Sequence, residues 1–184
     1  MPRVKLITSK DDIPAEQNAE FDGIVEVLNR VGGPFGVLMY SPGLALKVCQ
    51  AGAQVRLGST LQMKERELAI LAVSREKDAA YEWAAHIKVG RDNGLREEAI
   101  EACRNRGDVS KLEPDERDII TYTRQLLQKN KVEQSLFDEL TKRHGTRWLV
   151  ELTATIGQYQ YISAINNAFD LQPAPGSDVL PVPG

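Results

Sequence analysis

Apolar residues recur at intervals of three and four along most of the chain, and they almost never alternate over a useful length. Spacing of this kind places apolar side chains on one face of an α-helix, whereas a half-buried strand needs strict alternation. We therefore expect an all-α protein, a helical bundle of about seven or eight helices without a convincing strand.

Capping residues and helix breakers set the expected helix ends. The first helix follows Asp12 and Pro14 and ends before Gly32, and Pro34–Tyr40 is predicted to be an apolar loop. Later helices are expected over approximately residues 41–58, 61–75, 79–93, 96–103, 114–130 and 146–169, with a shorter helix before the last one that carries Leu136, Phe137 and Leu140 and stops at Gly145. Each is long enough to present one apolar stripe to a shared core.

The composition changes after Asp170, where prolines and glycines replace the periodic apolar pattern. Proline cannot continue a helix because it lacks the backbone N–H. We expect residues 1–170 to form a single helical domain and residues 171–184 to form an extended Pro-rich tail. The tail is either disordered, as free ends often are, or an arm laid over a neighbouring subunit.

The charge balance argues against nucleic acid and membrane surfaces as partners. The chain of 184 residues carries 23 basic and 26 acidic side chains, so it has no strong field of either sign. Neither a signal peptide nor a membrane-spanning run of roughly 20 apolar residues is evident. Cys49 and Cys103 are too few and too far apart for a disulfide framework. We expect a soluble, cytoplasmic protein that binds a small molecule.

Glu67 is the exception in a helix that is apolar nearly all round after Arg66. It shares a helical face with Met63, Ile70 and Ser74, so its carboxylate is expected to point into the interior. Burial of a carboxylate without a partner is costly. Glu67 is therefore a candidate functional residue.

Glu82 and His86 are four residues apart on the next helix, so they project from the same face about one turn apart. A buried Glu near a His can shift both pKa values toward neutrality and form a general acid/base pair. The competing interpretation is an ordinary helix-surface pair worth a few tenths of a kcal/mol. A metal site is not predicted, because His144, the other histidine, lies at a helix end and no further His or Cys falls at ligand spacing.

Aromatic residues flank the same position. Tyr81 and Trp83 are candidate substrate-binding residues, although Trp83 alone also fits core packing. The last helix is more polar than a simple core helix because of Tyr159, Tyr161, Asn166 and Asn167. These four side chains line either a cavity or an interface.

The residues singled out so far carry a resemblance to a known family, the carboxymuconolactone decarboxylase family, which includes the alkylhydroperoxidase D branch. The resemblance covers nearly all of the chain except the tail. It rests on Gly33-Pro34-Phe35, Ser41-Pro42, Glu65-Arg66-Glu67-Leu68-Ala69-Ile70-Leu71, Tyr81-Glu82-Trp83-Ala84-Ala85-His86, Gly94-Leu95 and the 149–169 helix with Asn166-Asn167.

The chain departs from the alkylhydroperoxidase D pattern at one point. That branch carries a Glu, a Cys-x-x-Cys and a His, and these positions fall on Glu67, on Ala79 and Glu82, and on His86. The dithiol is therefore absent, and a carboxylate cannot act as the recyclable sulfur that peroxide reduction needs. The chain resembles the decarboxylase branch better here.

The resemblance implies an alkylhydroperoxidase D-like helical subunit that assembles into a homo-oligomer, a trimer or a hexamer. It also implies a lyase without a cofactor, in which His86 is the general acid/base, Glu82 orients it, and Glu67 relays or tunes the proton. Decarboxylation, isomerisation and lactone chemistry on a small organic acid all fit these groups. Arg56, Arg75 and Arg124 are candidates to bind a substrate carboxylate, and the competing interpretation of each is a solvated charge on a helix face. The alternatives are a non-catalytic oligomeric binding or stress module and a peroxiredoxin-type peroxidase, which the missing Cys-x-x-Cys disfavours.

Overall fold

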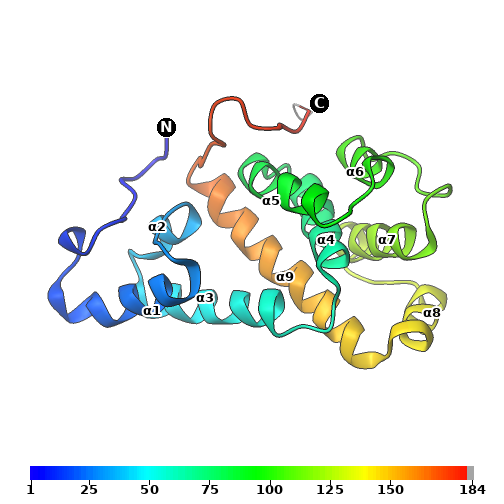
Figure 1. Cartoon of the computed structure of the whole chain (residues 1–184), viewed down its shortest axis with the longest axis horizontal. Coiled ribbons are helices and arrows are strands. Elements are labelled where there is room, and N and C mark those ends of the chain that lie inside the picture. The colour runs from blue at the N-terminus through cyan, green and yellow to red at the C-terminus, as the bar shows by residue number, and fades with distance from the viewer. Residues whose placement is uncertain (182–184) are drawn as a thin grey trace.

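Helices account for all the regular structure in the computed structural model, which describes residues 1–181 (Figure 1). No strand occurs within that range, so the expected all-α fold is confirmed. Two short 3₁₀ helices, Lys10–Asp12 and Ala15–Gln17, precede nine α-helices in the described part of the chain. These are α1 (Asn18–Leu28), α2 (Pro34–Leu38), α3 (Pro42–Leu57), α4 (Met63–Glu76), α5 (Ala80–Asp92), α6 (Glu97–Arg104), α7 (Pro114–Lys129), α8 (Gln134–His144) and α9 (Thr146–Ala168).

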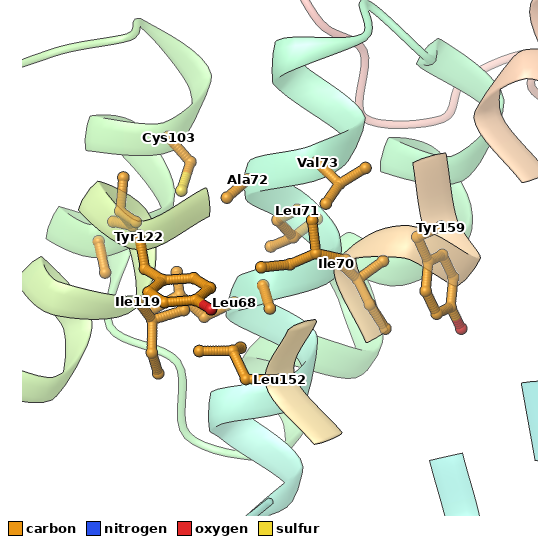
Figure 2. Packing of buried hydrophobic residues seen from close by; sticks show 14 of the residues in the cluster. Leu68, Ile70, Leu71, Ala72, Val73, Cys103, Ile119, Tyr122, Leu152 and Tyr159 are labelled. Atoms are coloured by element: carbon orange, nitrogen blue, oxygen red, sulfur yellow. The ribbon is translucent and has the colours of Figure 1, made fainter. Parts of the chain in front are cut away.

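α4 lies at the centre of the larger of two hydrophobic clusters. Every residue from Glu65 to Arg75 is buried, as expected of a helix that is apolar all round. α5, α6, α7 and α9 all pack against α4. Figure 2 shows Leu68 and Ile70 of α4 packed with side chains from α7 and α9, while Tyr159 stands at the edge of the group.

The smaller cluster joins the N-terminal segment, α1, α2 and α3 to the C-terminal half of α9. Its centre includes Phe21, Ile24 and Cys49, and α9 contributes Ile162. α9 also packs against α4, α5 and α8, and it runs through the middle of the molecule (Figure 1). One long helix therefore connects both clusters.

The segment predicted as an apolar loop, Pro34–Tyr40, instead contains the short helix α2. Pro34 occupies the first turn, where its fixed φ suits a helix and its missing N–H costs nothing. At Gly36 a side chain would meet Leu6 Cβ at 3.1 Å, and the Gly36 carbonyl accepts the Ile7 N–H at 2.9 Å. Five residues are too few to display a helical period, which is why the pattern did not reveal α2.

The C-terminal segment is extended after Asp170 and folds back over its own chain. The Asp178 carboxylate accepts hydrogen bonds from Trp83 Nε1–H at 3.2 Å and from Arg91 at 2.9 Å. Arg104 donates to the same carboxylate at 2.7 Å, and Leu180 is buried in the larger cluster. Residues 171–181 form neither helix nor strand, and the expected tail residues 182–184 lie outside the described part.

One solvent-exposed face of α9 carries no charged side chain, and we call this face the α9 stripe. Its members follow one another at intervals of three or four, and all are exposed; they are Val150, Ala154, Gly157, Tyr161, Ala164 and Ala168. Val150 is 60% exposed. None of the helices within residues 1–181 has both the length and the apolarity needed to cross a membrane.

Candidate active site

Glu67, Glu82 and His86 meet where α4 packs against α5. Glu67 lies near the middle of α4, and Glu82 and His86 lie one turn apart on α5. Gly90 helps α5 approach, since a side chain there would meet Leu95 at 2.7 Å and Glu67 Cβ at 3.7 Å. Both carboxylates are almost fully buried, while the His86 side chain keeps 16% of its surface exposed.

The His86 imidazole lies between the two carboxylates. Its Nδ1–H donates to Glu67 Oε2 at 2.7 Å, and Nε2 lies 3.5 Å from Glu82 Oε2. The hypothesis based on the family resemblance assigned Glu82 to orient His86, whereas the short contact in the structure is with Glu67. The longer contact with Glu82 leaves the Nε2–H available to another acceptor.

Three further side chains hold this arrangement in place. Arg66 Nε donates to Glu67 Oε1 at 3.4 Å, and Asn166 Nδ2 donates to Glu82 Oε1 at 2.8 Å. The Tyr159 ring stands edge-on to His86 with the ring centres 5.0 Å apart. Each carboxylate therefore contacts His86 with one oxygen and a second residue with the other.

The surroundings raise the pKa of His86 to about 9. Burial acts strongly in the opposite direction, because it disfavours the charged imidazolium, but the hydrogen bonds and charges of Glu67 and Glu82 together outweigh it. His86 is therefore an imidazolium at pH 7, poised to donate a proton. Burial raises the pKa of the Tyr159 hydroxyl, which stays protonated.

A cavity of about 180 Å³ opens beside His86, and we call it the His86 cavity. It lies between the two hydrophobic clusters, because α1, α2 and α3 supply one side while α5 and α9 supply the other. Its lining residues are Leu28, Pro34, Phe35, Gly52, Arg56, Glu82, Ala85, His86, Gln158, Tyr159 and Ile162. Typical drug-sized sites hold about 300–1,000 Å³, so this cavity suits a small ligand.

Tyr81 and Trp83, the expected substrate-binding residues, both lie outside the His86 cavity. Tyr81 faces Gly33 and lines a separate hollow with Gln172 and neighbouring tail residues. Trp83 is fully buried in the larger cluster, under the Arg104 guanidinium. The structure therefore brings together Glu67, Glu82 and His86 but not the two aromatic side chains.

The polar residues of the last helix point in different directions. Tyr159 and Asn166 contact the site, Tyr161 is exposed in the α9 stripe, and Asn167 Nδ2 donates to the Lys77 carbonyl at 2.7 Å. Gly52 and Gln158 also line the cavity and were missed by the sequence reasoning. Neither carried a signal, since their position depends on how α3 packs against α9.

Of the three arginines expected to bind a carboxylate, Arg56 alone lines the His86 cavity. Arg75 pairs with Asp78, and Arg124 contacts Glu76 at 3.6 Å and the Gly107 and Ala102 carbonyls. Arg56 Nε donates to the Gly52 carbonyl at 3.1 Å, and no carboxylate within residues 1–181 forms a salt bridge with it. Its terminal nitrogens are thus available inside the cavity.

The cysteines lie apart from this site. Cys49 is buried in α3, and Cys103 is buried in α6, where burial raises the pKa of its thiol to about 12. Ala79 and Glu82 stand where the alkylhydroperoxidase D pattern has its dithiol. Within the described residues, no group of three or more His, Cys, Asp or Glu side chains is arranged to hold a metal ion.

A larger cavity of about 560 Å³ lies between the N-terminal turn of α4 and the starts of α6 and α7. Its two arginines are already held by carboxylates: Arg96 by Glu116 at 2.6 Å and Arg143 by Asp115 at 2.8 Å. It contains no histidine. The smaller His86 cavity is therefore the better candidate for proton-transfer chemistry.

Residues 42–125 match the model of the carboxymuconolactone decarboxylase family. This segment belongs to that family. The match covers α3 to α6 and most of α7, and it includes Glu67, Glu82 and His86, so the resemblance stated from the sequence is confirmed. A search of curated proteins found no match to the chain.

Two solved structures share the fold across nearly the whole chain. The apo structure of the debrominase Bmp8 superposes with a TM-score of 0.66 at 15% identity, covering 94% of each chain. A cysteine-to-alanine variant of Bmp8 in complex with 2,3,4-tribromopyrrole gives 0.67 at 16% identity, covering 95% of each chain. At these identities the likeness is one of fold.

Proposed function

We propose that this chain is a cofactor-independent acid/base enzyme that acts on a small organic acid by decarboxylation, isomerisation or lactone chemistry. The observation that carries the proposal is the His86 imidazolium, held by Glu67 and Glu82 at the wall of a small cavity. The carboxymuconolactone decarboxylase family match supports this class of chemistry. Bmp8, with the same fold, binds a small unsaturated ring, which fits a cavity of this size.

His86 serves as the proton donor in this scheme. Glu67 fixes the ring through Nδ1 and keeps it protonated, so the proton on Nε2 points to the reacting atom. In a decarboxylation, the bond to the carboxylate carbon breaks and its electron pair passes to a conjugated carbonyl. Carbon dioxide leaves, His86 protonates the resulting enolate, and water restores the proton to His86.

Thiol-dependent peroxide reduction has little support. It needs an accessible thiolate, but both cysteines are buried in helices and neither lines the His86 cavity. Homo-oligomer formation, in contrast, is supported by the α9 stripe, because an exposed uncharged helix face suits contact with a second copy.

Replacement of His86 tests the proposal. In His86→Gln the side chain keeps its hydrogen-bonding capacity but has no transferable proton, so turnover is expected to fall by about a hundredfold to ten-thousandfold. The assay offers carboxymuconolactone and related unsaturated lactone acids in D₂O, and proton NMR follows product formation and deuterium uptake.

His144→Gln is the matched control, since His144 lies at the end of α8 outside the cavity, and its turnover should equal that of the wild type. Equal turnover by wild type and His86→Gln would show that His86 is not the proton donor. Saturable ligand binding without turnover of any compound would indicate a binding module instead.

A further inference from the structure

The charged residues around the His86 cavity limit the net charge that its ligand can carry. Three cations and two carboxylates form the charged groups at and directly behind the cavity wall. Arg56, His86 and Glu82 line the cavity, Glu67 contacts His86, and Arg66 contacts Glu67. Arg66 and His86 are paired with these carboxylates, whereas Arg56 has no carboxylate partner in the described chain. The excess is one positive charge, located on Arg56.

Arg56 is also shaped to receive a carboxylate. Its Nε–H is tied to the Gly52 carbonyl one turn earlier, which fixes the plane of the guanidinium. A fixed guanidinium presents its remaining N–H donors as a fork that matches a carboxylate. The side chain is half-buried, so solvent ions only weakly screen its attraction for an anion placed there.

The rest of the cavity is apolar on the side of the N-terminal helices, whereas α9 adds the uncharged polar groups of Gln158 and Tyr159. Leu28, Phe35 and Ile162 provide hydrocarbon walls. The residues that line the cavity include no cation besides Arg56 and His86. A second carboxylate on the ligand would face these walls or the Glu82 carboxylate. Such a placement costs free energy, because it buries an unpaired charge beside a like charge.

We propose that the His86 cavity binds a small unsaturated monocarboxylate, with its carboxylate on Arg56 and its reacting carbon at His86. This inference rests on the proposed acid/base function and narrows it. An ion pair with Arg56 stabilises the carboxylate and so opposes its loss as carbon dioxide. The retained carboxylate favours isomerisation or lactone interconversion over decarboxylation.

The two groups beside the ligand suffice for a double-bond shift. Glu82 removes a proton from the carbon next to the carboxylate, and the electron pair of that C–H bond moves to form the new double bond. The electron pair of the old double bond takes the proton from His86 Nε2 at the far carbon. The proton on Glu82 then returns to His86 across their 3.5 Å contact, so no electron is gained or lost.

Binding of short probes to the wild type and to Arg56 variants tests the inference. Calorimetry with crotonate and sorbate should show binding that weakens by about tenfold or more in Arg56→Gln, the range expected for a lost charged hydrogen bond. Arg56→Lys should recover part of the affinity. Glutaconate, a dianion of similar size, and crotonamide, which is neutral, should both bind more weakly than crotonate.

Arg147→Gln is the control, because Arg147 is 71% exposed and pairs only with Glu151 on its own helix, and its affinity should match the wild type. Thermal unfolding of each variant shows whether the fold is kept. Undiminished crotonate affinity in Arg56→Gln, tighter binding of glutaconate than of crotonate, or no binding of either monocarboxylate by the wild type would overturn the inference.

A second readout separates this inference from the proposed function. Conversion of 3-butenoate to crotonate in D₂O reports proton transfer and not only binding. Arg56-dependent binding without any deuterium uptake supports the carboxylate subsite and contradicts the acid/base function. Deuterium uptake that is equal in wild type and Arg56→Gln supports the acid/base function and contradicts the subsite.

Discussion

His86 owes its charge to two carboxylates that come from different helices. Glu67 is a buried acid on α4 whose charge is balanced by Arg66, and Glu82 is a buried acid on α5 whose second oxygen is held by Asn166. A histidine in this position is an acid at neutral pH and not the base that its usual pKa would suggest. The two carboxylates thus favour proton transfer from His86 to the ligand.

The pH dependence of folding follows from this charge. The pKa of His86 is about 9 in the folded chain and about 6.5 when unfolded. Because the folded pKa is raised, the stabilisation is complete below about pH 6.5 and is lost as the pH rises through about 9. The thermal midpoint should therefore fall across this interval in the wild type.

His86→Gln should lose that part of the pH dependence, and His144→Gln should keep it. Differential scanning calorimetry between pH 6 and about 9.5 measures the difference between the variants. Parallel curves for wild type and His86→Gln would contradict the raised pKa. The charged and titratable groups that face His86 are Glu67 on α4, Glu82 on α5, Tyr159 on α9, and Arg56 and Arg66 nearby.

The sequence revealed the candidate acid/base residues better than their roles. Spacing of four placed Glu82 and His86 on one face, and the apolar surroundings of Glu67 indicated its burial. Which carboxylate makes the short hydrogen bond depends on the packing of α4 on α5, which no local pattern encodes. The location of Arg56 in the His86 cavity could not be predicted either, since it depends on α3 packing beside α9.

At the scale of elements, α9 has three distinct faces. One face enters the larger cluster and carries Tyr159 and Asn166 to the site, one carries Ile162 into the smaller cluster, and the third is the α9 stripe. The sequence predicted a long and unusually polar helix there but left open whether its polar residues line a cavity or an interface. Tyr159 lines the His86 cavity, Asn166 holds the Glu82 carboxylate beside it, and the stripe remains available for an interface.

A charge in the α9 stripe tests the proposed homo-oligomer. Ala154→Glu places a carboxylate in the middle of the uncharged face, where burial against a second copy would be costly. We expect it to shift the protein to smaller species in analytical ultracentrifugation, with the helical content of the subunit unchanged.

Gln160→Glu, at an exposed position outside the stripe, is the matched control and should sediment like the wild type. If Ala154→Glu keeps the wild-type mass, the α9 stripe is not an interface between copies. A wild type that sediments as a monomer would contradict the proposed homo-oligomer itself.

Across the whole molecule, the C-terminal segment ties distant helices together. Asp178 links Trp83 and Arg91 of α5 to Arg104 of α6. The sequence predicted an extended Pro-rich tail, either disordered or laid over a neighbouring subunit, because proline forbids a helix. It gave no sign that one aspartate in that tail would find two arginines and a tryptophan of the same chain, since such contacts have no sequence period.

Asp178→Asn should destabilise the fold by about 1–2 kcal/mol, because its charged hydrogen bonds are only partly shielded from water. Urea unfolding followed by Trp fluorescence measures this, with Trp83 as a local reporter. Asp92→Asn, which breaks an exposed pair with Lys88, is the control and should change stability by less than about 0.5 kcal/mol.

The pH dependence of Asp178 has the opposite sign to that of His86. The Arg104 guanidinium, with further help from Trp83 and Arg91, lowers the pKa of Asp178 to about 2. Its contribution is therefore present above about pH 3.8 and is lost as the pH falls toward 2. Equal acid stability of wild type and Asp178→Asn would argue against these contacts in solution.

Because Glu82 stands where the alkylhydroperoxidase D pattern has a cysteine, the proposed chemistry does not use a dithiol. A dithiol must be reduced again after each turnover, so it depends on a reducing partner and stops when that partner is exhausted. A carboxylate and an imidazolium exchange only protons, which water always supplies. With Cys49 and Cys103 enclosed in helices, the proposed reaction is independent of the redox state of its surroundings and would continue under oxidative stress.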